Sequence, residues 1–470
     1  MTEPIEHSVA LIEELCIGCT ACVKACPTEA IRVHERRARI TEERCVDCGV
    51  CIVTCPVHAK VAHTNSIHSI YNYRYRIVLV PPEIMSQFPA EIPPQNILYG
   101  IKKLGFNEVH EIGVYAEKVS AVERQYFKRN NRALKRPLIS FHCPAIVRLI
   151  SVRFPSLIEN VIPVRTPLGS TARWLSTNKP KELGMKREEI GVFLITPCPA
   201  LMTRVKNPLT DTQRYIDGAI SFADVYADIL EAAQRMPPEN GVELKTRRTG
   251  LLWGAIGGEA EALGLDNMVW VDGMSQVVKM LEAVENGKLV QFDFLECRAC
   301  IGGCVGGPLM VDNVFLARNK LERLARKAGE TEPISEDEVI REMGFYKPDS
   351  GLAARPIDAL AQSPMEAIRK MKERKQILDA LPQIDCSACG APNCRALAED
   401  VVLGKAKITD CIFVLFEQAR VMSKRVYEWT SQLPVSLKPQ AEKLKAIGKI
   451  PLSGQLEAGE REEKEGGEKK

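Results

Sequence analysis

The stretch LECRACIGGCVGGP, residues 295–308, carries the densest cysteine and glycine pattern of the chain. Its Cys300 and Cys304 are separated by three residues and lie among glycines. Glycines let the backbone approach a bulky inorganic group and point amides at its sulfur atoms. Two more cysteines lie beside proline after apolar runs, Cys143 in LISFHCPAIV and Cys198 in VFLITPCPAL. We interpret the four as one thiolate cage for an iron–sulfur cluster.

Clustered cysteines that bind no metal usually form disulfides, act as catalytic thiols or pack in a core. The chain has 470 residues and 17 cysteines, and it begins without an apolar signal segment. Apolar runs also stay well short of the roughly 18 residues that a membrane span needs. We therefore expect a cytoplasmic protein without membrane insertion, and disulfides are rare in that reducing compartment. Metal or redox chemistry accounts for the cysteines more simply.

Charge and histidine content exclude further classes of protein. The net charge of +3 is too small to indicate nucleic acid or an anionic membrane as a partner. The chain is 45% hydrophobic and 26% charged, as ordinary globular proteins are. All seven histidines lie at or before His142, so zinc sites with imidazole ligands are excluded downstream.

The first sixty residues contain the pattern C-x2-C-x2-C-x3-C-P twice, 29 residues apart. This is the bacterial two-cluster ferredoxin pattern, in which the fourth cysteine of each run ligates the other cluster. We therefore expect two [4Fe–4S] clusters, one held by Cys16, Cys19, Cys22 and Cys55, the other by Cys45, Cys48, Cys51 and Cys26. A zinc ribbon is the alternative, which the doubled spacing with proline disfavours.

Two smaller features accompany these cysteines. Residues 30–40 alternate in polarity and predict a short β-hairpin between the clusters. His58, His63 and His68 follow closely, and we interpret them as polar surface residues because the eight cysteines already complete both clusters.

From residue 75 to 345, short apolar runs alternate with helical stretches, which indicates parallel α/β units. The cysteines at 143, 198 and 300 follow strand-like runs, and open α/β sheets place ligands at that end of their strands. Gly254, Gly257 and Gly258 could line the same site. They lack the dinucleotide-binding pattern, so a loop entering a helix is the simpler interpretation.

The C-terminal part begins with a linker and a charged helix between Ser350 and Leu381. The pattern C-x2-C-x4-C-x16-C follows and predicts a fourth cage, with zinc as the alternative metal, formed by Cys386, Cys389, Cys394 and Cys411. Helix 412–430 is amphipathic. We expect it to pack on this cluster domain, and a docking surface is the second interpretation. The tail from Ser453 is rich in Gly, Glu and Lys and is expected to be disordered.

The order of these motifs, two ferredoxin runs followed by HCP, PCPA and ACIGGCVGGP, resembles the [FeFe]-hydrogenase superfamily over about residues 8–325. It is closest to the sensory type, which also carries a single-cluster domain after the hydrogenase domain. The resemblance implies that the [4Fe–4S] part of an H-cluster is held by Cys143, Cys198, Cys300 and Cys304. It also implies that Cys304 bridges to a two-iron subsite with CO and cyanide ligands.

The chain departs from that family at four positions of the expected pocket. Leu201 stands where the family has a lysine that hydrogen-bonds a cyanide ligand. Arg298 and Thr196 each replace a methionine, and His142 replaces a cysteine that relays protons. These changes favour a cubane without a working two-iron centre, or a centre that serves binding rather than turnover.

Two residues of this region have competing interpretations. His142 is either a side chain packed at a strand end and hydrogen-bonded to backbone, which we prefer, or a proton relay with a suitable pKa. Cys297 belongs to no set, and we expect a buried, inert thiol that faces away from the site.

These patterns predict an α+β ferredoxin-like dicluster domain, a two-lobed α/β hydrogenase-type domain and a small α-rich C-terminal cluster domain. The expected boundaries are 1–74 for the ferredoxin domain, 75–345 for the hydrogenase-like domain, 346–380 for linker and helix, 381–430 for the last cluster domain and 431–470 for the tail.

Three functions compete. The first is an electron-transfer protein with four [4Fe–4S] clusters in a redox or sensing hetero-complex, with a ferredoxin or oxidoreductase subunits as partners. The second is a sensory or low-activity hydrogenase that carries the two-iron subcluster, so enzymatic activity stays open. The third is a structural or iron–sulfur assembly role. In the electron-transfer function, electrons enter by the N-terminal pair of clusters or by the C-terminal cluster, and they pass through the buried cage between them.

Overall fold

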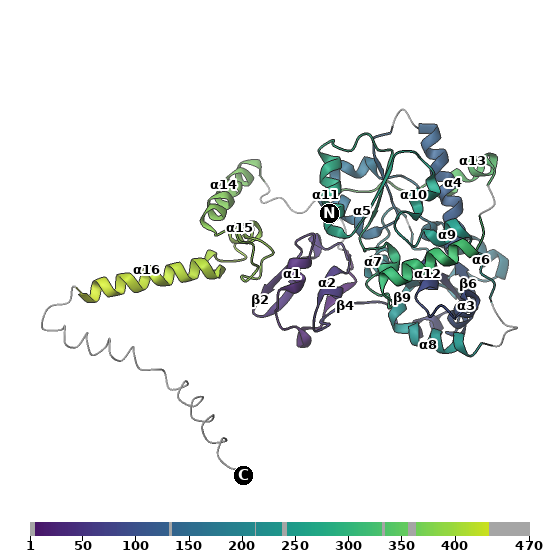
Figure 1. Ribbon diagram of the computed structural model, residues 1–470, viewed down its shortest axis with the longest axis horizontal. Helices are drawn as coiled ribbons and strands as arrows, with labels where there is room; N and C mark the ends of the chain where they lie inside the picture. Colours follow the sequence, from purple (N-terminus) through teal and green to yellow (C-terminus); the bar gives the residue numbers. More distant parts are fainter. Residues whose placement is uncertain are drawn as a thin grey trace, which may run out of the picture. The chain divides into compact units, whose positions relative to one another are not determined.

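The computed structural model describes residues 5–130, 134–211, 213–236, 242–330, 334–355 and 363–431. The chain forms two compact units, one of residues 1–367 with 385–392, the other of residues 368–384 with 393–470 (Figure 1). The tail that is expected to be disordered lies outside the described residues.

The N-terminal part of the first unit is a small two-layer module. Strand β1 (Val9–Leu11) pairs antiparallel with β4 (Lys60–Ala62), and β2 (Ile31–His34) pairs antiparallel with β3 (Arg37–Ile40). The second pair is the predicted hairpin. Short helices α1 (Ala21–Ala25) and α2 (Val50–Thr54) each follow a cysteine loop. The predicted ferredoxin-like fold is confirmed.

The first lobe of the central region contains a parallel four-stranded sheet in the order β6-β5-β8-β9. Its strands are β5 (Tyr75–Val80), β6 (Glu108–Glu111), β8 (Ile190–Thr196) and β9 (Gly218–Ser221). Every residue of β8 is buried, as expected for a central strand covered on both faces. The covering helices include α3 (Pro94–Lys103), α6 (Pro167–Leu183) and α8 (Phe222–Gln234).

The second lobe contains a parallel three-stranded sheet in the order β10-β11-β7. Its strands are β10 (Met268–Asp272), β11 (Phe294–Arg298) and β7 (Leu138–Ile139). The largest core of the molecule lies here and includes residues of α4 (Gly113–Asn130), α5 (Pro144–Arg153), α10 (Gly258–Leu263), α11 (Met274–Glu285) and α13 (Glu336–Tyr346). The predicted two-lobed α/β architecture is confirmed.

Further helices connect the lobes: α7 (Pro199–Lys206), α9 (Arg248–Leu252) and α12 (Val314–Lys327). Short 3-10 turns lie at Glu13–Leu15, Glu42–Arg44, Ile67–Asn72, Pro82–Ser86, Pro155–Asn160, Arg187–Glu189, Cys304–Gly306 and Ile408–Asp410. Gly257 begins α10 with a positive φ of 87°, so the glycine-rich stretch is a loop entering a helix, as expected.

The C-terminal region is helical and contains α14 (Pro364–Ala380), α15 (Cys394–Val402) and α16 (Ile412–Ser431). The preferred interpretation of α16 is wrong, because its large apolar side chains do not pack in a core. Phe416 is 65% exposed and Trp429 is 68% exposed. None of the described helices is both long and apolar enough to cross a membrane.

Candidate iron–sulfur sites

The cysteines of the ferredoxin module form two groups that exchange their fourth members. Cys16, Cys19, Cys22 and Cys55 line one common pocket. Cys48 and Cys51 each lie within electrostatic range of Cys26, and Cys45 lies within range of Cys48 and Cys51. Cys51 is also within range of Cys22 of the first group. This is the crossed arrangement that the spacing predicts, and four convergent thiols suit an iron–sulfur cubane.

Backbone amides support both crossing cysteines in the same way. The N–H of Ala30 donates to Cys26 Sγ over 3.3 Å, and that of Ala59 donates to Cys55 Sγ over 3.2 Å. Each donor lies four residues after its cysteine, beyond the Cys-Pro turn. Amide hydrogen bonds favour the thiolate, which is the form that ligates iron.

The four cysteines of the central region lie together although three segments contribute them. Cys143, Cys198, Cys300 and Cys304 line one pocket, which the ferredoxin residue Cys48 also lines. Cys143 is the N-cap of α5 and Cys198 that of α7, and proline follows each at the first helical position. Proline suits that position because its missing N–H would have no helical partner. The Cys-Pro pairs thus fix each thiol between a strand and a helix.

Burial and helix amides act in opposite directions on these thiols. Burial raises the pKa of Cys198 to about 12, while the amides of Leu201 and Ala200 lower it in part. Burial likewise raises the pKa of Cys143, while hydrogen bonds from the amides of Ala299, Ile146 and Ala145 lower that pKa in part. Without metal these thiols therefore keep their protons, and metal binding releases them.

A close contact between a glycine backbone and two proline rings joins the ferredoxin loop to the buried cage. A Cβ atom on Gly49 would lie 2.5 Å from Pro308 and 3.2 Å from Pro199, so only glycine fits there. The contact of Gly49 makes the second ferredoxin group and the buried cage direct neighbours. Within the loop of the buried cage itself, Gly303 has a φ of 90°, and a Cβ on it would lie 2.5 Å from the nitrogen of Ile256.

A buried ion pair also spans this junction. Asp47, between two ferredoxin cysteines, accepts from Arg148 Nη1 over 3.2 Å and contacts His7 Nδ1 at 2.7 Å. It accepts two more hydrogen bonds, each 3.0 Å long, from the amides of Ser8 and Val9. Arg148 lies on α5, which begins directly after Cys143. The network thus ties the loop of one cage to the helix of the next.

His142 faces the cage. Its Nε2 atom lies 3.9 Å from Cys304 Sγ, and its ring packs edge-on against Trp253 at 5.4 Å between centroids. Its Nδ1 atom is buried without a hydrogen-bond partner among the described residues. The ring thus packs after a strand as the preferred interpretation expects, but the backbone hydrogen bond that it also expects to the ring is absent among the described residues. The backbone amide of His142, in contrast, donates to Ser140 Oγ over 3.2 Å.

Arg298 is fully buried and turned into a group of carboxylates. Its Nε donates to Glu296 Oε1 over 3.0 Å and its Nη2 to Glu259 Oε2 over 3.1 Å. Its Nη1 has no partner among the described residues. Burial raises the pKa of Glu296 to about 7 and that of Glu123 to about 8, with repulsion from Glu296 adding to the latter.

Sequence reasoning missed these carboxylates. One signal was available, because Glu296 is a charged residue between Leu295 and Cys297, in a strand that is apolar up to the cysteine motif. Glu123 and Glu259 lie on helices whose charge pattern suggests solvent, yet both are at most 3% exposed. Cys297 is completely buried in the core, as expected.

The C-terminal cysteines fall in both units. Cys386 and Cys389 belong to the loop 385–392 of the first unit, whereas Cys394 and Cys411 belong to the second. The loop packs on the ferredoxin hairpin, because the N–H of Val33 donates to the oxygen of Gly390 over 3.0 Å.

These contacts change the expected electron route. Val33 also lines the pocket of Cys16 and its partners, so loop 385–392 adjoins the first ferredoxin group. The second ferredoxin group adjoins the buried cage. Within the described first unit, loop 385–392 and the buried cage therefore contact different ferredoxin groups, and the buried cage does not lie between them as expected.

Convergent cysteine cages in this geometry define an iron–sulfur protein. Residues 74–264 and 241–308 match the family described as "Iron only hydrogenase large subunit, C-terminal domain". Together these matches span half of the 470-residue chain, and the chain belongs to this family. Residues 15–59 match a 4Fe-4S dicluster domain and residues 381–413 a putative Fe-S cluster.

Similar solved structures are [FeFe]-hydrogenases. A variant of HydA1 from Chlamydomonas reinhardtii is 15% identical, with 61% of this chain and 96% of that chain covered and a TM-score of 0.46. HydA(deltaEFG), from a structure concerned with stepwise H-cluster assembly, is 15% identical, with 62% and 98% covered and a TM-score of 0.47. The family match and the cysteine cages together show iron–sulfur cluster domains on a hydrogenase scaffold.

Proposed function

We propose that this protein transfers electrons through four [4Fe–4S] clusters, in a series that ends at the buried cage of Cys143, Cys198, Cys300 and Cys304. The contact of Gly49 with Pro308 and Pro199 carries the proposal, because it brings the loops of two cages into direct contact. A bound [4Fe–4S] cluster accepts and releases a single electron. The protein residues supply the thiols, the amide donors and the exclusion of water.

The first ferredoxin group of the series offers access for a partner. Cys19 is exposed, as are Leu15 at 47% and Ile17 at 55% beside it. The proposed partner is a ferredoxin or a subunit of an oxidoreductase, bound in a hetero-complex in the cytoplasm of an anaerobe. Apolar side chains around an exposed cluster suit such short-lived redox contacts, which bury little surface.

A hydrogenase or hydrogen sensor is the second candidate, and Cys304 is the observation that favours it. Its thiol lies at the cage with His142 beside it, where the family resemblance implies a bridge to a two-iron subsite. His142 would then hold a proton at Nε2. Against this stand Leu201, which offers no charged donor, and Arg298, whose guanidinium is held by Glu296 and Glu259.

One experiment separates the candidates. Full-length protein is reconstituted anaerobically, one half is exposed to the hydrogenase maturation enzymes, and iron and infrared spectra are measured on both. About sixteen irons per chain without CO or cyanide bands would support electron transfer, since four cubanes need that number. CO and cyanide bands would favour the second candidate. An iron content far below sixteen after full reconstitution would contradict both.

A further inference from the structure

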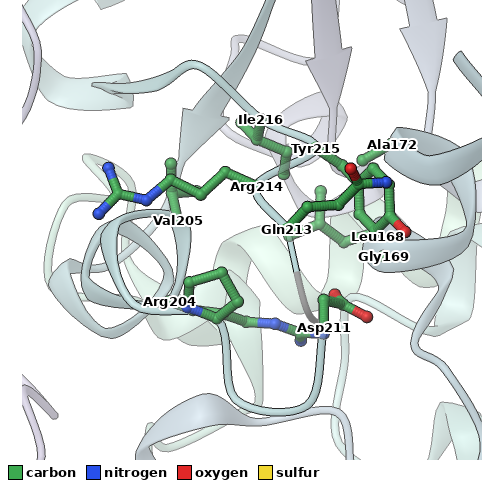
Figure 2. Close-up of a pocket in the computed structure, with 11 residues that line it drawn as sticks. Leu168, Gly169, Ala172, Arg204, Val205, Asp211, Gln213, Arg214, Tyr215 and Ile216 are labelled. Atoms are coloured by element: carbon green, nitrogen blue, oxygen red, sulfur yellow. The ribbon is translucent and has the colours of Figure 1, made fainter. Parts of the chain in front are cut away.

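Small cavities such as the one in Figure 2 leave no room for a macromolecular partner. This cavity, which Arg204, Asp211 and Tyr215 line, has a volume of about 30 Å³, enough for about two water molecules. Its acidic member, Asp211, already forms an ion pair with Arg165. A partner therefore needs an exposed surface, and helix α16 offers one.

Helix α16 leaves a long apolar face uncovered by the other described residues. Its large apolar side chains with high exposure are those of Ile412, Phe413, Leu415, Phe416, Val421, Met422, Val426, Tyr427 and Trp429. A continuous apolar surface on a single chain usually marks an interaction site. The helix begins directly after Cys411, so this face starts at the last cysteine motif.

Part of this face has the residue spacing of a coiled coil. Alternating steps of three and four residues connect Ile412, Leu415, Ala419, Met422, Val426 and Trp429, which we call the α16 seam. In heptad notation, Ile412, Ala419 and Val426 occupy position a, and the other members occupy position d. Every member of the seam is exposed. The seam can therefore accept a second helix along its whole length.

The charges of α16 lie away from the seam. Glu417 and Lys424 occupy position f, on the opposite side of the helix, and Glu417 pairs with Arg420 of the same helix at 2.8 Å. Positions e and g, which flank the seam, hold Phe416, Gln418, Ser423 and Arg425 within residues 412–429. Among these flanking residues only Arg425 is charged. Two copies of α16 can thus pair without placing like charges opposite each other.

A second copy of the same helix suits the seam better than other occupants do. Coiled coils between different helices usually select their partner through charges at positions e and g, and here those positions are nearly uncharged. Helices that lie on membranes have a basic polar face, whereas Glu417 and Glu428 add acidic charge to the polar side of α16. Self-pairing needs neither kind of charge pattern.

The residue types of the seam also indicate the number and direction of the helices. Ile412 and Val426 are β-branched residues at position a, and Leu415 occupies position d. This combination favours two parallel helices. In parallel pairing each seam residue meets its own copy, so Met422 packs against Met422 of the second chain near the middle of the contact.

We propose that α16 forms a two-stranded parallel coiled coil with α16 of a second copy of this chain, along the α16 seam. The pairing brings the C-terminal cysteine motifs of two copies together, because each α16 begins directly after Cys411. A seam this short gives a reversible dimer that dissociates on dilution. The inference is independent of the proposed function, since it rests on the surface of one helix.

The test measures the oligomeric state of the full-length protein with its clusters reconstituted. Anaerobic sedimentation velocity over a series of protein concentrations should show monomer and dimer in equilibrium. Met422→Glu places two carboxylates face to face in an apolar contact and should raise the dissociation constant at least tenfold. Met422 is 64% exposed in the single chain, so this variant should keep its fold and its iron content.

A matched control lies on the same helix. Tyr427 is 62% exposed, almost as much as Met422, but it occupies position b outside the seam. Tyr427→Glu introduces the same charge at a similar exposure and should leave the dissociation constant unchanged. A loss of dimer in both variants would overturn the assignment of the contact to the seam.

A mixing experiment tests the direction of the helices. Met422→Glu and Met422→Lys should each be monomeric, whereas an equimolar mixture should form dimers because position 422 meets itself in a parallel pair. In an antiparallel pair Met422 meets Ala419 of the second chain, and mixing restores nothing. A mixture that stays monomeric would overturn the parallel arrangement.

Two further results would overturn the inference as a whole. One is a wild-type protein that remains monomeric at every concentration, including a monomer that binds vesicles with anionic lipid and so uses the face at a membrane. The other is a dimer that Met422→Glu leaves intact, because such a dimer would form through another surface.

Discussion

The Nε2 atom of His142 lies 3.9 Å from the Sγ atom of Cys304. A donor at a cluster sulfur stabilises the reduced, more negative state and so raises the reduction potential. His142→Phe keeps an aromatic ring against Trp253 but removes the donor. We expect the potential of the buried cluster to fall on the order of 50 mV, since a hydrogen bond is worth about 1 kcal/mol. A redox titration followed by electron paramagnetic resonance measures this, with His63→Gln as control. An unchanged reduction potential would mean that His142 does not donate a hydrogen bond to the Sγ atom of Cys304.

Arg148→Met should destabilise the junction between the ferredoxin loop and the buried cage. It leaves Asp47 buried with one cation fewer, a change that costs up to about 3–5 kcal/mol. Arg153→Met on the same helix is the matched control, because its pair with Glu282 is more exposed and is worth under about 1 kcal/mol. Calorimetry should show a clearly lower melting temperature for Arg148→Met only. Equal melting temperatures would mean that the buried pair does not hold the two parts together.

Glu123→Gln should stabilise the protein increasingly as pH rises. Burial raises the pKa of Glu123 to about 8, and one of its oxygens has no partner among the described residues. An unfolded glutamate ionises near pH 4.5, so the folded state loses stability from there up to about pH 8 and no further above it. The gain in melting temperature over wild type should therefore grow between about pH 5 and 8 and then level off. Glu188→Gln, at an exposed position, should give no such trend, and a gain that is constant with pH would contradict the raised pKa.

Cysteine substitutions should separate ligands from neighbours. Cys300→Ser should lower the iron content of reconstituted protein by about four atoms, one cubane. Cys297→Ala, three residues earlier in the chain, should keep all of the iron because Cys297 lies in the apolar core. Iron analysis with matched protein determination checks both. Full iron content in Cys300→Ser would remove this residue from the ligand set.

Local spacing made much of the structure predictable. The exchange of Cys26 and Cys55 follows from two identical runs, because the tight loops leave the fourth thiol pointing at the other group. Cys143 and Cys198 were expected at strand ends because each follows an apolar, strand-like run, and each is the N-cap of the helix that follows. The hairpin at residues 30–40 followed from polarity alternation alone.

Long-range contacts could not be predicted in this way. Helix α16 has an amphipathic sequence that predicts packing, yet its apolar side chains are exposed, because amphipathicity does not say which surface is available. The buried Glu123 and Glu259 look like ordinary helix surface residues in the sequence. Their burial arises because α4 and α10 pack against β11 in one core.

The sequence by itself determined which residues can form cysteine cages and which secondary structure holds them, because both depend on neighbours in the chain. The tertiary structure alone decided which cysteine loops lie side by side in the first unit, through the contacts of Gly49 and Gly390 with distant segments. It also decided the burial of Glu123 and Glu259, because folding packs α4 and α10 against β11 in one core. Spacing in a sequence carries no information about such long-range contacts.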